Sequence, residues 1–159
     1  MLSVNNLRVI VIQPALAPFP EAMKTPAAEA LLLGTALVES GLMYLRQGLQ
    51  RLDDGRGAAL GLWQMEARTH EDHWRYLQRH PAIAAAIEIG PKPPPERLCT
   101  DLLYACRMAR VHYWRVRAKM PEADDLQGLA DYWKPFYNTE LGAGDPAAFV
   151  RLYTKHVKP

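Results

Sequence analysis

Apolar residues recur at helical spacing through most of this chain, and helix-capping residues stand at the ends of several of these stretches. The clearest stretch begins with Thr25 as an N-cap and Pro26 as the first helical residue, and continues through "AAEALLLGTALVES". Apolar side chains on this stretch recur at steps of three, four and seven, which is typical of a buried helix face. The pattern therefore predicts a helix from Pro26 to about Gly41.

Four further segments show the same kind of pattern. Thr69 resembles the start of a capping box for a helix over 70–80, which Pro81 would end. The longest apolar periodicity predicts a single helix over 96–118. An Ala/Ile-rich segment at 82–89 and a proline connector at 91–95 separate these two helices. A further helix is predicted over 126–136, capped by Asp124 or Asp125. Asp145 and Pro146 begin the last predicted helix.

The segment 50–65, "QRLDDGRGAALGLWQM", has a different character. Its glycines and aspartates are turn formers around short apolar pieces, which favours a loop or a small β-hairpin. We therefore expect one mainly α domain over 1–159, with a small β-hairpin or irregular insert after the first helix and an extended N-terminal segment at 1–24.

Composition bounds the class of protein. The 159 residues are 49% hydrophobic and 23% charged, which is typical of a single folded domain. A net charge of +2 is too small to indicate nucleic-acid binding, and no apolar run approaches the ~20 residues of a membrane span. The apolar run Val9–Ile12 is too short for a cleaved signal peptide. Cys99 and Cys106 lie seven residues apart on one predicted helix, beyond disulfide reach, so we expect free thiols.

Two clusters of charged or metal-ligating residues have ordinary explanations. The arginines of the 96–118 helix are predicted to form a solvated face: Arg107, Arg110, Arg115 and Arg117. The segment "RMARVHYWRVRAK" at 107–119 leaves a nucleic-acid binder as a weaker alternative. His70 and His73 share a helix face without a third ligand, so we expect surface histidines, no metal site and no cofactor.

Glu39 is the one acid in the apolar stretch "GTALVESGLMYL". It shares the face that buries its helix, close to the negative end of the helix dipole. Both surroundings disfavour the carboxylate and would raise its pKa, which suits a general acid near neutral pH. An outward-turned or arginine-paired glutamate is the alternative.

Three short motifs follow one another in order: "ES" at 39–40, "GLWQM" at 61–65 and "YN" at 137–138. Together they resemble those of the lysozyme-like lytic transglycosylases and goose-type lysozymes, in particular transglycosylase-like proteins of bacteriophages. The resemblance covers roughly 26–144. The third motif departs from the family pattern, since "FYNTELGAG" replaces an alanine, "YN" and a glycine.

The resemblance implies a lysozyme-like fold with Glu39 as the catalytic acid and Ser40 beside it. It also implies a sugar cleft lined by Gly61, Leu62 and Gln64 of the second motif, with Tyr137 and Asn138 near the glutamate. The flat apolar ring of Trp63 suits a platform for a sugar, and a place in the core is the equal alternative.

Cleavage of a β-1,4 glycosidic bond by the common routes requires a second carboxylate, for which Asp53, Asp54 and Glu66 are the candidates. A lytic transglycosylase requires none, because the 6-hydroxyl of muramic acid attacks the anomeric carbon. We therefore expect a lytic transglycosylase that acts on peptidoglycan glycan strands, either in a phage virion, where other virion proteins would be partners, or in the host cytoplasm with delivery to the periplasm. The alternatives are a muramidase with an Asp partner and a peptidoglycan-binding virion protein without catalysis.

Overall fold

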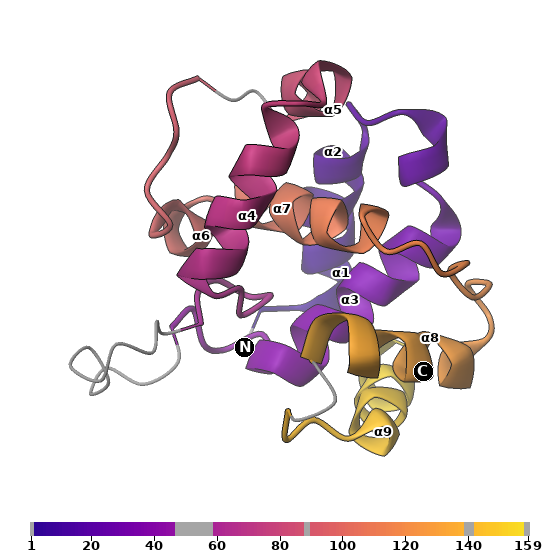
Figure 1. Ribbon diagram of the computed structural model, residues 1–159. Coiled ribbons are helices and arrows are strands. Elements are labelled where there is room, and N and C mark those ends of the chain that lie inside the picture. The colour runs from indigo at the N-terminus through magenta and orange to yellow at the C-terminus, as the bar shows by residue number, and fades with distance from the viewer. Residues whose placement is uncertain (1, 47–58, 88–89, 139–141, 158–159) are drawn as a thin grey trace.

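The computed structural model describes residues 2–46, 59–87, 90–138 and 142–157. These residues are mainly helical and contain no strand, which confirms the mainly α class (Figure 1). The buried side chains form one hydrophobic cluster to which the N-terminal segment, the central helices and the C-terminal helix all contribute. No helix in the described ranges is long and apolar enough to cross a membrane.

Helix α3, Pro26–Ser40, has the predicted ends. The Thr25 hydroxyl accepts a hydrogen bond from the backbone N–H of Ala28 at 3.2 Å, and Pro26 occupies the first turn. Gly41 ends the helix in the left-handed conformation at φ +58°, where a side chain would be strained. Local chemistry therefore fixes both ends of the helix that carries Glu39.

The N-terminal segment was predicted to be extended, and this prediction is wrong. Residues 4–16 are helical, as α1 (Val4–Asn6), the π-helix η1 (Leu7–Ile12) and α2 (Gln13–Leu16), and a 3-10 turn η2 (Glu21–Met23) follows. Leu7, Ile12 and Leu16 are buried, and η1 packs on α3 while α2 packs on α7. Tertiary burial of one apolar face stabilises helix in this segment.

The predicted helix over 96–118 is two helices, α6 (Arg97–Thr100) and α7 (Leu102–Trp114). Asp101 separates them in an extended conformation, and its carboxylate accepts the backbone N–H of Tyr104 at 2.9 Å as the N-cap of α7. Aspartate competes for backbone hydrogen bonds in this way and so favours helix ends over helix interiors. The longest described helix is therefore α3, with 15 residues, against 13 in α7.

Two further boundaries differ from the prediction. Helix α4, Ala67–Leu77, begins one turn before the predicted Thr69 cap, because the carbonyl of Glu66 already accepts the N–H of His70 at 3.0 Å. The segment after it is a short helix, α5 (Pro81–Ala86), which Pro81 begins.

The expected β-hairpin is not seen in the described part of the insert. Leu60 exchanges two backbone hydrogen bonds of 2.9 Å with Met65, and Arg46 forms an isolated bridge with Leu60. These isolated bridges do not form a strand within the described residues.

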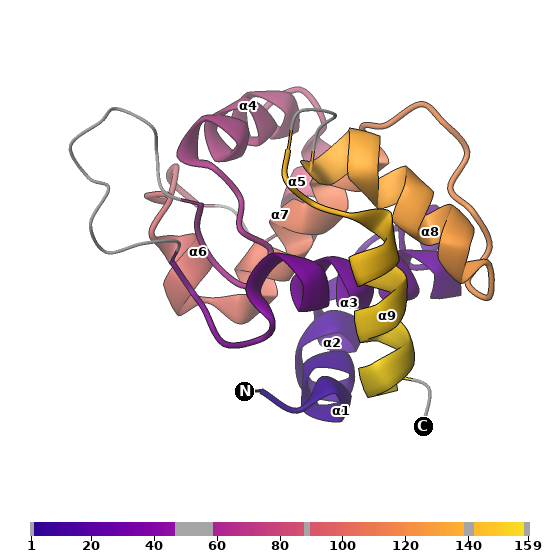
Figure 2. The same ribbon diagram turned by 90° about the horizontal axis from the view of Figure 1, so that it is seen from below.

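Helix α8, Leu126–Trp133, is capped by Asp125 as predicted and continues into the π-helix η3, Lys134–Asn138. The last helix, α9 (Pro146–Val157), packs against both α3 and α8 (Figure 2). The ring of Phe149 on α9 lies over Gly34 of α3, where a Cβ atom would collide with it. The glycine therefore sets the close approach of these two helices.

The side chains of α7 and its C-terminal extension differ partly from expectation. Cys99 and Cys106 are free thiols, as predicted. The four arginines do not form one solvated face, because Arg110 is buried and Arg115 pairs with Asp72 at 2.6 Å.

Candidate active site

Glu39 lies in the last turn of α3 at the wall of a cavity of about 430 Å³. The other walls come from the 59–66 turn, the start of α4, helix α7 and the π-helix η3. Residues far apart in sequence thus meet here, and those with polar side chains include Glu39, Gln64, Glu66, His112, Tyr137 and Asn138.

Two neighbours on α8 and η3 hold the Glu39 carboxyl group. The indole N–H of Trp133 donates to Oε1 of Glu39 at 3.0 Å, and the side chain of Asn138 forms a second hydrogen bond. Burial raises the pKa of Glu39, while these two hydrogen bonds and the charge of Lys134 lower it and only partly offset the burial. The net effect keeps a proton on Glu39 at higher pH than on an exposed glutamate, as a general acid requires.

Asn138 is held in one orientation. Its Oδ1 accepts hydrogen bonds from Nζ of Lys134 at 2.9 Å and from the backbone N–H of Gly144 at 3.0 Å. Because the oxygen is occupied, the amide NH₂ is the group available to Glu39. Of the three side chains that act on Glu39, Trp133 ends α8, and Lys134 and Asn138 belong to the π-helix η3, a conformation that is frequent at functional sites.

Tyr137 joins two walls of the cavity. Its hydroxyl donates to the backbone carbonyl of Trp63 at 2.7 Å, and its ring stacks on Tyr113 with centroids 5.1 Å apart. Burial raises the pKa of Tyr137 well above its usual value, so the phenol stays neutral. Tyr137 therefore positions the 61–65 turn relative to η3.

The second motif forms the tight turn of the cavity wall. Gly61 has φ +72°, and a Cβ there would collide with the backbone carbonyl of Leu98. Gln64 has φ +46°, which is uncommon for a residue with a side chain, and its Nε2 donates to the carbonyl of Gly61 at 2.7 Å. Backbone strain of this kind is concentrated at functional sites.

Four of the expected cleft residues do not line the cavity: Gly61, which shapes the turn, and Ser40, Leu62 and Trp63. Ser40 is buried, and its hydroxyl donates to the carbonyl of Ala36 at 2.9 Å as part of the helix end. Leu62 is in the hydrophobic core. Trp63 is also in the core, where its indole N–H donates to the carbonyl of Leu32 at 2.9 Å, so its ring offers no face to a sugar.

The candidate second carboxylates divide into two groups. Asp53 and Asp54 lie outside the described residues. Glu66 lines the same cavity as Glu39 and forms an ion pair with Arg68 at 2.7 Å. Glu66 is therefore the candidate partner whose place is known.

His70 and His73 were predicted to be surface residues, and this prediction is wrong. Both are buried, and Nε2 of His70 lies 2.6 Å from the hydroxyl of Tyr104. Nε2 of His73 lies 2.9 Å from Nδ1 of His112, whose Nε2 donates to the carbonyl of Phe136 at 2.6 Å. Nδ1 of His73 accepts from Arg115 at 2.7 Å. The chain of bonds from Arg115 to Phe136 requires both imidazoles to be neutral, with Nε2 protonated in each.

This chain of bonds anchors η3 to α7 and α4. Burial, followed by the charges of neighbouring groups, lowers the pKa of His73 to about 2. Burial also lowers the pKa of His112. Within the described ranges, no group of three His, Cys, Asp or Glu side chains is placed to hold a metal ion.

Sequence patterns did not reveal three residues of the site: Trp133, Lys134 and His112. Trp133 falls within the predicted helix over 126–136, but an indole that bonds a carboxylate 94 residues away leaves no local signal. His112 appeared only within the basic segment 107–119.

Known proteins add no constraint to this geometry. Comparisons of the chain with protein-family models, with curated proteins and with solved structures gave no match.

Proposed function

We propose that this protein is a peptidoglycan-cleaving enzyme, a lytic transglycosylase that acts on the β-1,4 bond between MurNAc and GlcNAc with Glu39 as general acid and base. The observation that carries the proposal is the setting of Glu39, a half-buried carboxyl group with a raised pKa that is held by Trp133 at the wall of a cavity. The order of the "ES", "GLWQM" and "YN" motifs supports the choice of substrate.

The reaction begins with the protonated form of Glu39. It transfers its proton to the glycosidic oxygen as the bond from that oxygen to C1 of MurNAc breaks. The 6-hydroxyl of the same MurNAc then bonds to C1, and Glu39 takes the hydroxyl proton. The products are a free 4-hydroxyl on GlcNAc and a 1,6-anhydroMurNAc end, and Glu39 returns to its protonated state.

Lysozyme-type hydrolysis is the second candidate, and the position of Glu66 favours it. Glu66 lines the cavity with Glu39, as the second carboxylate of a muramidase would. In that reaction water supplies the new oxygen on C1, and the product has a reducing end. In that role the carboxylate of Glu66 would be oriented by its ion pair with Arg68.

Purified peptidoglycan tests the proposal. The Glu39→Gln variant keeps the size of the side chain and removes its acidic proton, so we expect its rate to fall at least ~100-fold. Unchanged circular dichroism would show that the variant is folded. Mass spectrometry of the wild-type products should reveal 1,6-anhydromuramic ends.

Glu66→Gln is the matched control within the same cavity. A transglycosylase should retain most of its rate in this variant. Reducing ends in the products, together with loss of rate in Glu66→Gln, would replace the transglycosylase with a muramidase. An active Glu39→Gln variant would disprove both, and binding without any released fragment would indicate a non-catalytic peptidoglycan-binding protein.

A further inference from the structure

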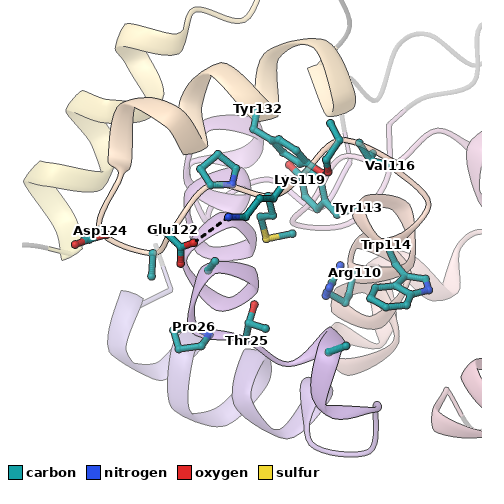
Figure 3. A pocket seen from close by; sticks show the side chains of 16 residues that line it. Thr25, Pro26, Arg110, Tyr113, Trp114, Val116, Lys119, Glu122, Asp124 and Tyr132 are labelled. Atoms are coloured by element: carbon teal, nitrogen blue, oxygen red, sulfur yellow. Dashed lines mark hydrogen bonds and ion pairs between the residues drawn. The ribbon is translucent and has the colours of Figure 1, made fainter.

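A second and larger cavity, of about 750 Å³, lies away from Glu39. Its walls come from the start of α3, the C-terminal end of α7 and the connection 115–125 between α7 and α8 (Figure 3). A volume of this size is in the range of small-molecule sites. The proposed cleavage reaction makes no use of it.

Arg110 lies on the wall of this cavity and is only 3% exposed. Its Nε donates to the backbone carbonyl of Met23 at 2.5 Å, but its Nη1 is buried without a hydrogen-bond partner. Burial lowers the pKa of Arg110 to about 10, so the guanidinium remains charged at neutral pH. The other groups that act on this pKa are Tyr132 and Cys106, and neither is a carboxylate.

A buried charge without a counter-ion is costly to the fold, since it loses its hydration and gains no ion pair in return. Lys119, the other cation of the cavity, already has a partner, because its Nζ lies 3.7 Å from a carboxylate oxygen of Glu122. Arg110 is thus the cationic group of this cavity whose donor is left unused.

The remaining walls suit a ligand with an apolar body. The guanidinium carbon of Arg110 lies 5.5 Å from the centroid of the Trp114 ring, and these two side chains lie together at one end of the cavity (Figure 3). Met120 and Val116 add further apolar surface. Glu122 and Asp124 lie at the other end, where they would repel a second negative charge (Figure 3).

We propose that this cavity binds a small organic carboxylate whose carboxylate group pairs with Arg110 and whose apolar body lies against Trp114. A monoanion matches one guanidinium, whereas a phosphate dianion would bring a second charge toward Glu122 and Asp124. The site is independent of the catalytic role of Glu39.

Calorimetric titration of the full chain with phenylacetate tests the site. A ligand of this size should bind with a Kd on the order of 1 mM or below, and the indole N–H signal of Trp114 should shift as it saturates. Neutral phenylacetamide has nearly the same shape, and it should bind at least about tenfold more weakly because it cannot form the ion pair. Phenyl phosphate should also bind more weakly than phenylacetate.

Arg110→Met should weaken phenylacetate binding at least about tenfold. Because this variant removes a buried side chain and its bond to Met23, Trp114→Ala provides a second test at a position that is 36% exposed, and it too should weaken binding. Arg117→Met is the matched control, since Arg117 is exposed and does not line the cavity. Glu39→Gln should bind phenylacetate as the wild type does, which separates this site from the catalytic proposal.

Several outcomes would overturn the assignment. The absence of saturable binding at millimolar phenylacetate would disprove the proposed binding site. If phenylacetamide bound as tightly as phenylacetate, or if folded Arg110→Met bound phenylacetate as the wild type does, the ion pair with Arg110 would be disproved. Tighter binding of phenyl phosphate would replace the carboxylate with a phosphate ligand.

Discussion

At the scale of single residues, the proton affinity of Glu39 reflects opposed effects of unequal size. Burial disfavours the carboxylate and is the largest effect, whereas the hydrogen bond from Trp133 favours it. The sequence alone allowed the first effect to be expected from the apolar face of α3. The second effect depends on a contact between α3 and α8 that no local pattern encodes.

Replacing Trp133 with Phe should therefore move the pH dependence of cleavage. The change removes the indole N–H that stabilises the ionised form of Glu39, so the pKa of Glu39 should rise further. A general acid is active below its pKa, and the alkaline limb of the profile of kcat/KM against pH should shift to higher pH.

Trp63→Phe is the control for this variant. Trp63 is equally buried, but its indole N–H donates to the backbone carbonyl of Leu32 and not to Glu39. It should lose stability by a similar amount and leave the alkaline limb in place. A shift of the same size in both variants would show that packing, and not the hydrogen bond to Glu39, controls the profile.

At the scale of helices, the contact between α3 and α9 depends on Gly34. In a helix interior alanine is favoured over glycine by up to about 1 kcal/mol, but here its Cβ would collide with the buried ring of Phe149. Overpacking of a core typically costs about 1–3 kcal/mol, so Gly34→Ala should lower the free energy of unfolding and reduce Tm by several degrees. Thermal unfolding followed by circular dichroism measures both.

Gly90→Ala is the matched substitution, since no atom lies within 4 Å of a Cβ at that position. Its stability should remain within about 0.5 kcal/mol of the wild type. A higher Tm for Gly34→Ala would mean that the Phe149 ring moves aside at little cost and that the higher helix propensity of alanine controls the stability.

Helix ends could be predicted where one or two residues determine them, and helix continuity could not. Thr25, Pro26 and Gly41 define α3 by local chemistry, and the structure confirms them. The apolar period through 96–118 concealed the break at Asp101, because the periodicity of buried positions continues across a capped junction. Similarly, the buried face of residues 4–16 forms helix only in contact with α3 and α7.

The candidate site was predictable to a similar extent. The motifs identified Glu39, Gln64, Tyr137 and Asn138, all of which line one cavity. They do not distinguish residues that face the cavity from those that support it, since the motif letters do not indicate which way each side chain of the turn points. Trp63 is the clearest case, because it turns into the core beside Gln64.

At the scale of the whole molecule, two buried neutral histidines and a half-buried one link the fold to pH. His70, His73 and His112 come from α4 and α7, and burial is the largest cause of the lowered pKa of each. Their neighbours include one another and Arg115, and further charge among them would be repulsive. Protonation of this cluster would also break the bonds from Arg115 to Phe136 that anchor η3 beside the catalytic glutamate.

Stability should consequently fall as the pH is lowered below about 6.5, the usual pKa of histidine in an unfolded chain. Between about pH 6.5 and 2 the unfolded chain binds a proton at His73 that the folded protein does not, so the free energy of unfolding rises with pH across this window. From pH 7.5 to 5, His73 alone should cost about 2 kcal/mol, while the raised pKa of Glu39 acts in the opposite direction. Urea unfolding at the two pH values measures this loss of stability, which should be smaller in His73→Gln. His156→Gln is the control, because His156 is a partly exposed histidine of α9, and this variant should lose as much stability as the wild type. Equal losses in both variants would mean that acid destabilises this fold through groups other than the buried histidines.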